Sequence, residues 1–572
     1  MNRGKLGILG GLLLALILLV PVESSLAADL LRVAGTVRSG QGKGVADARL
    51  VVLVNGHPVP SVGGDGEPKS SNRGSFAGDF LLPAGTLPTA QVAVQAAKPA
   101  WRTTEPVPLV VHAEGTDPEG RRLFSAQAHL TLERQVTPAF WLAAAILAVV
   151  YLLIALEWLH RTLAALLGAA LMLFVSYTLG VWDERFFIVS FEDAMQGVDL
   201  NVIFLLLGMM IFVGVLKRTG LFPWLAARAY GAARGNVFVL AGFLMGITAF
   251  LSAFLDNVTT MLLMIPVTLE IALTLRIPPL SLLIPEVFAS NVGGTATLIG
   301  DPPNILIGSY ANLTFAQFLH HLTAICVVAL AAAVGFFLAY YCRDYRRAQV
   351  KDFAATLARL KAEHPITDRR LLCWGLSLLG LTIFLFIIHG VLHMEPSVAA
   401  LTGAMLLLVF SRVNIVEMLE REVEWPTLVF FMALFIIIAG AEETGLIQFL
   451  AEGVRQLSGD SLPRAVILVL WVSAIASALI DNIPFTATML PIVAFLNQQL
   501  PGAESGVLWW ALALGACLGG NGTLIGASAN VVTVGLAERA GYPISFMDYL
   551  QACLPPMLLT VLLSMAYLLL WY

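Results

Sequence analysis

The sequence predicts an all-α polytopic membrane protein that carries a small β-sandwich domain near its N-terminus. Three observations support this fold class. The 572 residues are 58% hydrophobic and only 12% charged, with a mean hydropathy of +0.83, a balance that soluble globular domains do not have. Apolar segments follow one another from Phe140 onward, and the two halves of this apolar region match each other in nearly constant register.

The N-terminal end is expected to be exported. Residues 1–28 combine Arg3 and Lys5 with an apolar run and end in small residues. This order is typical of a secretory signal peptide, and a first membrane helix is the alternative. Residues 29–135 then lie on the exterior or periplasmic side of the plasma (inner) membrane. Their short alternating runs, such as 48–54 and 126–132, are separated by Gly, Pro, Asn and Asp turns, which predicts a β-sandwich.

Membrane crossings are predicted wherever an apolar segment approaches about 20 residues. Two apolar stretches, 236–275 and 463–499, are each broken near the middle by an Asp-Asn pair. Each half of these stretches is at or below the length of a full span, so a re-entrant helix–tip–helix hairpin fits better than two crossings. The expected full spans are 139–158, 162–181, 201–217, 280–311 (interrupted), 322–342, 371–391, 396–411, 426–443, 507–534 (interrupted) and 550–570.

Basic residues orient these spans. Lys217, Arg218, Arg228 and Arg234 flank the first hairpin, and the loop 343–370 is rich in lysine and arginine. By the positive-inside rule both regions are cytoplasmic, and the acid-rich segment 182–200 lies outside. The expected domains are transporter repeat 1 (137–343), a cytoplasmic linker (344–368) and transporter repeat 2 (369–572).

An internal duplication relates the two repeats. Each repeat holds five crossings and one hairpin, and an odd number of crossings inverts the second repeat relative to the first. The two hairpins therefore enter from opposite sides of the membrane, and their tips meet near its middle. The matching segments are 219–221 with 444–446, 256–257 with 481–482, and 293–304 with 519–530, at offsets of 225, 225 and 226 residues.

Polar residues at membrane depth mark the candidate site. Amides, carboxylates and glycine-broken backbone are tolerated there only when they are buried in protein or line a watery cavity. We therefore expect an ion or substrate site formed by two tips and two broken helices. The candidate binding residues are Asp256, Asn257, Thr259, Gly293, Gly294, Thr295, Thr297, Asn304, Asp481, Asn482, Gly519, Gly520, Asn521, Thr523 and Asn530.

Asp256 and Asp481 are the central candidates. A carboxylate near the bilayer midplane costs on the order of 2.5–3.5 kcal/mol, so each needs a partner. That partner is a proton, or Na⁺ shared with Asn257 and Asn482. Because burial disfavours and a cation favours the charged form, ion and proton can compete for one site. The alternative is that each aspartate only caps its hairpin tip.

The remaining candidates also have structural alternatives. Glu286 and Asp301 have no acidic counterpart in repeat 2, which makes them further proton-coupling candidates beside Asp256 and Asp481. An ion pair or a surface position would explain them equally well. The duplicated glycines expose carbonyls for a cation and helix N-termini for an anion, although any single one could serve close helix packing. Asn304 and Asn530 either support freed carbonyls or contact substrate.

Several function classes are excluded. A net charge of −5 argues against a nucleic-acid partner. The cysteines are scattered and no histidine falls in the central clusters, so no disulfide framework and no metal centre is expected. Because there is no Walker motif and no protease signature, we expect neither an enzyme nor a cofactor other than the coupling ion, Na⁺ or H⁺.

The central motifs resemble a known family. The strings DNVTT, EVFASNVGGTATLIGDPPNILIG and DNIPFTATMLP are similar to the ion transporter superfamily, in the branch that holds arsenite permeases, NhaD-type sodium–proton antiporters and the melanocyte P protein (a citrate transporter-like domain). The resemblance covers roughly 137–572. It implies a homodimer in the lipid membrane, a small inorganic ion or organic anion as substrate, and elevator-type alternating access.

Three functions stay open at this point. The favoured one is a secondary active transporter coupled to H⁺ or Na⁺, either a sodium–proton antiporter or an arsenite-type permease. A Na⁺-coupled citrate or dicarboxylate symporter is the first alternative; the family's dicarboxylate carriers have Ser-Asn-Thr at both tips, where this chain has Asp256-Asn257 and Asp481-Asn482. A membrane sensor that uses its exported β-domain is the second alternative, and the duplicated polar sites argue against it.

Overall fold

The computed structural model describes residues 28–572 apart from 40–43, 46–47, 63–67, 72–73, 84, 88–89, 99–100, 103, 118–120, 135, 350–351 and 460. The expected signal segment therefore lies outside the described residues except for its last position. The chain forms two compact units. One comprises the described residues up to Ala139 with Asp183–Phe187, and the other comprises Phe140–Trp182 with the described residues of Ile188–Tyr572.

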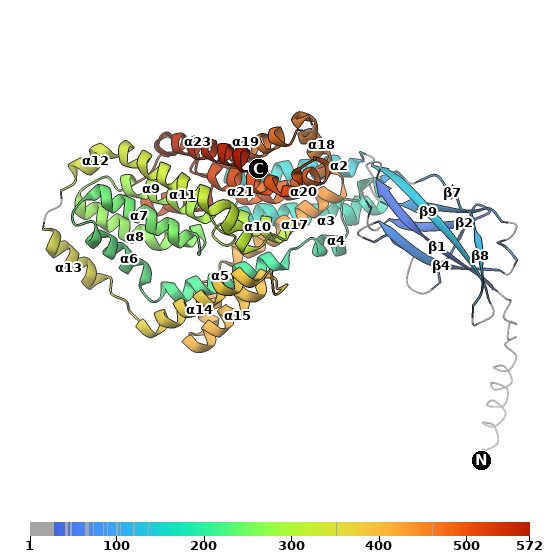
Figure 1. Ribbon diagram of the computed structural model, residues 1–572, viewed down its shortest axis with the longest axis horizontal. Coiled ribbons are helices and arrows are strands. Elements are labelled where there is room, and N and C mark those ends of the chain that lie inside the picture. Colours follow the sequence, from blue (N-terminus) through green and yellow to red (C-terminus); the bar gives the residue numbers. More distant parts are fainter. Residues whose placement is uncertain are drawn as a thin grey trace, which may run out of the picture. The chain divides into compact units, whose positions relative to one another are not determined.

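The N-terminal unit contains two β-sheets (Figure 1). One sheet has the order β4 (Ser75–Pro83), β1 (Ala28–Ser39), β9 (Arg122–Arg134), β6 (Trp101–Arg102), with β8 (His112–Thr116) also paired to β9. The other has the order β3 (His57–Val59), β2 (Arg49–Val54), β5 (Val92–Ala97), β7 (Val107–Pro108).

The two sheets share one hydrophobic core, to which Leu31, Val52, Val94 and Leu130 all contribute. In β2 and β5, among others, alternate residues point inward, and this alternation is why runs such as 48–54 and 126–132 predicted strands. The predicted β-sheet region is thus confirmed. Strand β8 was not predicted, because all five of its residues are exposed and show no alternation.

The second unit is helical. Among the described residues, nine helices are long and apolar enough to cross a membrane, which confirms the predicted polytopic fold class. In chain order its helices are α2 (Pro138–Ala155), α3 (Arg161–Trp182), α4 (Phe191–Gln196), α5 (Leu200–Lys217), α6 (Leu221–Ala232), α7 (Val237–Ser252), α8 (Asn257–Leu275), α9 (Leu280–Thr295), α10 (Pro302–Ala311), α11 (Phe315–Tyr340), α12 (Cys342–Arg347), α13 (Phe353–Glu363), α14 (Arg369–Ile388), α15 (Pro396–Ser411), α16 (Ile415–Arg421), α17 (Trp425–Glu443), α18 (Leu446–Ser458), α19 (Leu462–Leu479), α20 (Asn482–Gln499), α21 (Val507–Gly519), α22 (Ser528–Arg539) and α23 (Phe546–Trp571).

The predicted breaks occur where the sequence placed them. Span 280–311 is divided into α9 and α10, and span 507–534 into α21 and α22, while α7–α8 and α19–α20 turn at the two Asp-Asn pairs. By length alone α8 and α19 could each cross a membrane. However, residues of both tips, Asp256 and Asn482 among them, line one cavity inside the helical unit, as the hairpin interpretation requires.

The two repeats pack in equivalent ways and interlock. Helix α9 packs on α7 and α8, and α21 packs on α19 and α20 in the same manner. In addition, α10 of repeat 1 packs on α20 of repeat 2, and α22 of repeat 2 packs on α8 of repeat 1. The second part of each broken helix therefore packs on the hairpin of the other repeat. The central region of the helical unit thus needs both repeats.

Two glycines permit the close approach of these helices. A Cβ on Gly293 of α9 would lie 2.1 Å from the carbonyl oxygen of Ala249 in α7, and a Cβ on Gly519 of α21 would lie 2.4 Å from that of Ala474 in α19. Both obstacles are backbone atoms, which cannot rotate away. The two duplicated glycines thus set the distance between hairpin and broken helix in each repeat.

Gly293→Ala is expected to lower the thermal stability of the purified protein, because overpacking against fixed backbone costs about 2 kcal/mol. Gly246→Ala is the matched control, since Gly246 also lies in a membrane helix of repeat 1 but has nothing within 4 Å of the place that a Cβ would occupy. A thermal-unfolding assay in detergent checks the pair. Equal midpoints for the two variants would contradict the assigned packing.

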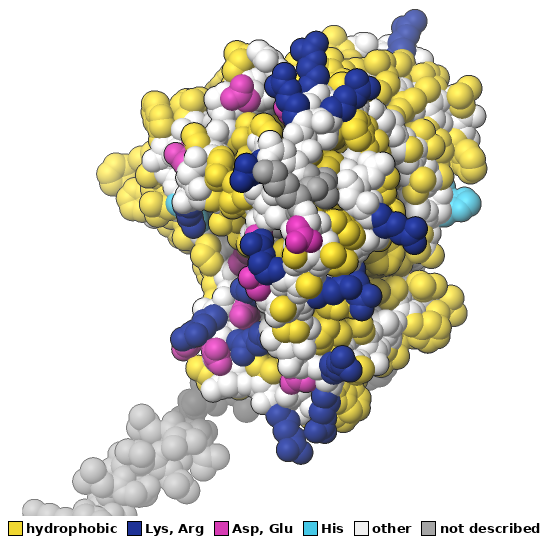
Figure 2. Space-filling view, turned by 90° about the vertical axis from the view of Figure 1, so that its left-hand side faces the viewer, with side chains coloured by type: hydrophobic (Ala, Val, Ile, Leu, Met, Phe, Trp, Pro, Cys, Tyr) yellow, Lys and Arg dark blue, Asp and Glu magenta, His cyan; other side chains and the backbone are white. Residues whose placement is uncertain are grey.

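One end of the helical unit is strongly basic. Figure 2 shows lysine and arginine side chains gathered over the end where α6, α12 and α13 lie. Exposed side chains of this group include Arg228, Arg346, Arg347, Arg359 and Arg369. The expected linker 344–368 is largely helical, and its helix α13 packs on α6.

Candidate functional site

The hairpin tips and the broken helices meet at one central cavity. Both repeats contribute to it through their tips and broken helices. They also contribute through α3, α5 and α17, which are part of the repeats but belong to neither a hairpin nor a broken helix. Much of the lining is apolar, from side chains such as Met209 and Ile305. Its polar lining residues are Arg161, Asp256, Asn257, Thr259, Asp301, Glu424, Thr427, Asn482 and Ser528.

The first tip presents Asp256. This residue is the N-cap of α8, and its Oδ2 accepts hydrogen bonds from the backbone N–H of Thr259 at 3.0 Å and from Thr259 Oγ1 at 3.1 Å. Its Oδ1 has no hydrogen-bond partner among the described residues. Asp256 therefore caps the helix with one oxygen and leaves the other without a protein partner among the described residues, so capping does not rule out ion binding.

The second tip presents Asp481, whose charge has a protein partner. Its Oδ1 accepts from the backbone N–H of Ile483 at 3.1 Å, and its Oδ2 accepts from Arg161 Nη1 at 3.1 Å and from Ser528 Oγ at 2.9 Å. We expected Na⁺ or a proton as the partner of this carboxylate. In this conformation the guanidinium of Arg161 takes that place.

Arg161 was not predicted as a site residue. It is the first residue of α3, donates from Nη2 to Thr427 Oγ1 at 3.3 Å, and lies 5.5 Å from the centre of the Phe430 ring. Its partners belong to three other helices: Thr427 and Phe430 lie in α17, Ser528 lies in α22, and Asp481 is the N-cap of α20. A lone arginine at the start of an apolar span ordinarily anchors a helix at the membrane surface, so nothing local in the sequence distinguished it.

A chain of buried asparagines links the two repeats. Asn257 Nδ2 donates to Asn291 Oδ1 at 3.1 Å, and Asn291 Nδ2 donates to Asn521 Oδ1 at 3.0 Å and to Asn530 Oδ1 at 2.9 Å. Asn291 was also missed, because its equivalent position in repeat 2 is Cys517 and the duplication gave it no support. The chain couples the tip of repeat 1 to the broken helix of repeat 2.

Other predicted residues support the broken helices from behind the lining. Asn304 Nδ2 donates to the carbonyls of Thr295 and Thr297 at 3.0 and 2.8 Å, and Asn530 Nδ2 donates to those of Gly520 and Thr523 at 2.8 and 2.9 Å. These bonds satisfy carbonyls that the helix break leaves without an intrahelical partner. Of the two roles considered for the asparagines, support of the backbone is the one with direct contacts.

The duplicated threonines make equivalent contacts. Thr297 Oγ1 donates to the carbonyl of Ala253, and Thr523 Oγ1 donates to that of Ala478. Each bond ties the break of a helix to the adjacent hairpin in its own repeat. Thr295 Oγ1 donates within its helix, to the carbonyl of Asn291 at 2.7 Å. These hydroxyls are thus used for holding the scaffold of the cavity together.

The acidic residues without counterparts in repeat 2 fall in different places. Asp301 is 1% exposed, lines the cavity, and accepts from Asn482 Nδ2 at 3.4 Å on both carboxylate oxygens. It therefore joins the broken helix of repeat 1 to the tip of repeat 2. Glu286 is buried in α9 and is not part of the described lining. Glu424, which we did not single out, lines the cavity and accepts from Thr427 Oγ1 at 3.2 Å.

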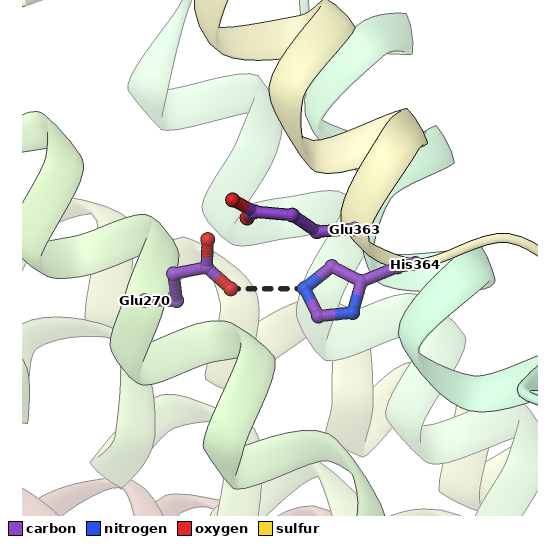
Figure 3. Close-up of side chains that lie close together, drawn as sticks. All are labelled: Glu270, Glu363 and His364. Carbon is purple, nitrogen blue, oxygen red and sulfur yellow. Dashed lines mark hydrogen bonds and ion pairs between the residues drawn. The ribbon is translucent and has the colours of Figure 1, made fainter.

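A second group of ligating side chains lies outside the cavity (Figure 3). Glu270, Glu363 and His364 bring their ligand atoms within 4.8 Å of one another, the one such group of three among the described residues. His364 Nε2 lies 2.9 Å from Glu270 Oε2, while Arg359 pairs with Glu270 at 3.4 Å and with Glu363 at 3.7 Å. Because Arg359 already supplies a positive charge, we interpret the group as a clasp between the linker and α8.

Comparisons with known proteins place this geometry in context. A family model described as a citrate transporter matches residues 151–515. An uncharacterized transporter of Mycobacterium bovis is 44% identical over 409 residues, which cover 71% of this chain and 92% of that protein. The P protein of Sus scrofa is 36% identical over 545 residues, which cover 81% of this chain and 63% of the P protein.

A solved structure has a related fold. The crystal structure of the Alcanivorax borkumensis YdaH transporter, described as revealing an unusual topology, superposes with a TM-score of 0.52 at 17% identity and covers 72% of this chain and 98% of that chain. At this identity the likeness concerns the fold alone.

Proposed function

Since the chain belongs to the citrate transporter family of membrane transporters, we propose that it exchanges a small cation for protons and does not carry citrate. The family branch that the motifs predicted is confirmed by the P protein relatives. Membership makes the chain an integral membrane transporter, and it supports the expectation that the chain is not an enzyme. The ion, the coupling and the mechanism are the subject of the proposal.

The observation that carries the proposal is the excess of acidic groups at the cavity. Asp256, Asp301 and Glu424 line it, and Asp481 borders it, whereas Arg161 is the single lysine or arginine in its described lining. A monovalent cation 4 Å from one carboxylate gains about 4 kcal/mol at an effective dielectric constant of 20. Citrate, with several carboxylates of its own, would be repelled by the same groups.

Helix termini do not reverse this balance. The N-termini of α8, α10, α20 and α22 converge here, and each contributes roughly half a positive charge. Those of α8 and α20 are already capped by Asp256 and Asp481. The positive charge that remains at the N-termini of α10 and α22 is smaller than the negative charge of the carboxylates at the cavity. The site therefore favours a cation. Because each free carboxylate can hold either that cation or a proton, binding of one displaces the other, which is the basis of exchange.

The proposal includes an orientation. A neighbouring cavity with Lys217, Arg421 and Glu422 in its lining shares Glu424 and Thr259 with the central one. Lys217 ends α5, next to the cytoplasmic loop that the positive-inside rule assigns. We therefore assign this conformation as open toward the cytoplasm, with residues 29–135 outside the plasma membrane. Inverted repeats, a homodimer and elevator-type movement of the hairpins would provide access from the other side.

The test is flux in proteoliposomes that contain the purified full chain and a trapped pH indicator. We expect external Na⁺ to drive proton movement that the membrane potential alone does not account for. We expect no flux of labelled citrate or arsenite. Citrate-dependent Na⁺ uptake would instead establish the symporter, and arsenite flux the permease.

The sensor alternative has its own measurement. A chain that lacks 29–135 should keep its exchange activity if the helical unit is the transporter, since the cavity is lined entirely by residues of that unit. Absence of flux for every ion tested, in intact chain and truncated chain alike, would overturn the proposed function.

A further inference from the structure

We propose that Glu286, Thr248 and Thr268 form a proton-binding site inside repeat 1, separate from the central cavity. The three residues come from α9, α7 and α8, and the side chain of each is 0% exposed. None of them belongs to the described lining of the cavity. The claim concerns binding of a proton, so it stands or falls independently of which ion the central cavity transports.

The geometry leaves two polar atoms without partners. Thr248 Oγ1 donates to Glu286 Oε1 at 2.8 Å. The other carboxyl oxygen, Glu286 Oε2, and the hydroxyl Thr268 Oγ1 are both buried and have no hydrogen-bond partner among the described residues. Thr268 nevertheless lies close enough to interact with the Glu286 carboxyl. Buried polar atoms without partners cost about 1–3 kcal/mol each. Two of them side by side therefore indicate that a hydrogen bond forms between them when one of the two carries an additional hydrogen.

A proton bound to Glu286 supplies the hydrogen for this bond. When Glu286 Oε2 binds a proton, the new O–H group can donate to Thr268 Oγ1, so that one added hydrogen satisfies both atoms and removes the buried charge. An ionised carboxylate at this place would have no cation beside it, and an uncompensated buried charge costs several kcal/mol. A metal ion fits less well, because hard cations take about six oxygen ligands and only four side-chain oxygens, two from Glu286 and one from each threonine, meet here.

Among the described residues, the surroundings contain no counter-charge that would keep Glu286 ionised. Helix α7 carries no titratable side chain, and the acidic residue of α8, Glu270, is paired with His364 and Arg359. Glu538 and Arg539 of α22 are exposed. The buried titratable side chains on the other helices that pack against α9 are the thiols of Cys326, Cys517 and Cys553 and the phenol of Tyr549. Tyr345 of α12 is also buried and donates its hydroxyl to the carbonyl of Ser281 in α9 at 2.6 Å, and none of these groups is positively charged.

Repeat 2 shows that packing does not require a carboxyl group at this position. With the offsets of the internal duplication, the positions equivalent to Glu286, Thr248 and Thr268 are Leu512, Ser473 and Val493. Leu512 is fully buried in α21, so an apolar side chain is accommodated at the same place between hairpin and broken helix. The presence of an acid in repeat 1 alone is therefore better explained by a chemical role, such as proton binding, than by the need to fill space.

Infrared spectroscopy of the full-length protein tests the proposal. At neutral pH we expect a carboxylic-acid C=O band that disappears in Glu286→Gln and moves to higher frequency in Thr268→Val, where the acceptor hydroxyl is lost. Ser473→Ala, the equivalent of Thr248 in repeat 2, should leave the band unchanged. Glu286→Leu, which introduces the side chain found at this place in repeat 2, provides a second variant should Glu286→Gln fail to fold.

The opposite result is equally clear. If no carboxylic-acid band is sensitive to either substitution of Glu286, the side chain is ionised and the proposal is wrong, whatever the flux assay shows. If the band is lost in the Glu286 variants but unaffected by Thr268→Val, Glu286 is protonated without the predicted hydrogen bond, and the three-residue site is wrong.

Discussion

Asp256→Asn is expected to lower the initial rate of cation–proton exchange at least about 100-fold. The asparagine keeps the size of the side chain but removes the charge that faces the ion and the group that can take its proton. A unit charge at 4 Å is worth about 4 kcal/mol at an effective dielectric constant of 20, and each 1.4 kcal/mol is a factor of ten. The predicted decrease stays inside that limit because solvent and ions weaken electrostatic interactions at a site that exchanges its ion with the aqueous phase. The measurement is the rate of Na⁺-driven pH change in proteoliposomes.

Asp368→Asn is the matched control for this substitution. Asp368 is also a helix N-cap, accepting from the backbone N–H of Leu371 at 2.9 Å, but it is exposed at the start of α14. Asparagine is as good an N-cap as aspartate, so both variants should fold normally. Exchange by Asp256→Asn at a rate close to that of the control would remove Asp256 from the site and leave it as a capping residue only.

Arg161→Met should abolish exchange and also destabilise the protein by about 2 kcal/mol. Without the guanidinium, Asp481 and Ser528 lose a charged partner, and breaking a buried ion pair costs up to 3–5 kcal/mol. The lower figure applies here because the Arg161 side chain remains 23% exposed. Thermal unfolding in detergent measures the loss of stability, and the proteoliposome assay measures the loss of exchange.

The double variant Arg161→Met with Asp481→Asn separates the two effects. Removing both charges eliminates the uncompensated carboxylate, so stability should recover most of the way while exchange stays absent. This non-additivity is the signature of a direct pair. If the two substitutions simply add in stability, or if the double variant transports normally, the ion pair of Arg161 with Asp481 is not part of the transport site.

A local sequence pattern identified some residues of the site and missed others. Asp256, Asn257, Asp481 and Asn482 were found because polar residues duplicated inside apolar segments have few explanations other than a site. Their contacts nevertheless differ between the repeats: Asn257 bonds to Asn291, whereas Asn482 bonds to Asp301. The duplication predicted equivalent positions, and it could not predict that the two tips meet different partners.

Arg161, Asn291 and Glu424 show what escaped the sequence. Arg161 and Asp481 are 320 positions apart, and Asn291 and Asn530 are 239 apart, so no periodicity connects them. Glu424 lies 225 positions after Asp199, and each of the two stands just before a helix; a residue at the start of a span gives no hint that it lines a cavity. Each of the three belongs to the site through helices that meet only in the folded chain.

The amino-acid sequence by itself determined the membrane fold class, the β-sheet region, the two hairpins and the two broken helices. It could do so because apolar length, alternation and helix-breaking residues act over a few turns of chain. Only the tertiary structure decided that Arg161 neutralises Asp481, that Asp256 keeps one oxygen free, and that Glu286 is sealed away from the cavity. The physical reason is that electrostatic interactions and desolvation depend on distances in space, and these are set by how α3, α17 and the two interlocked repeats pack together.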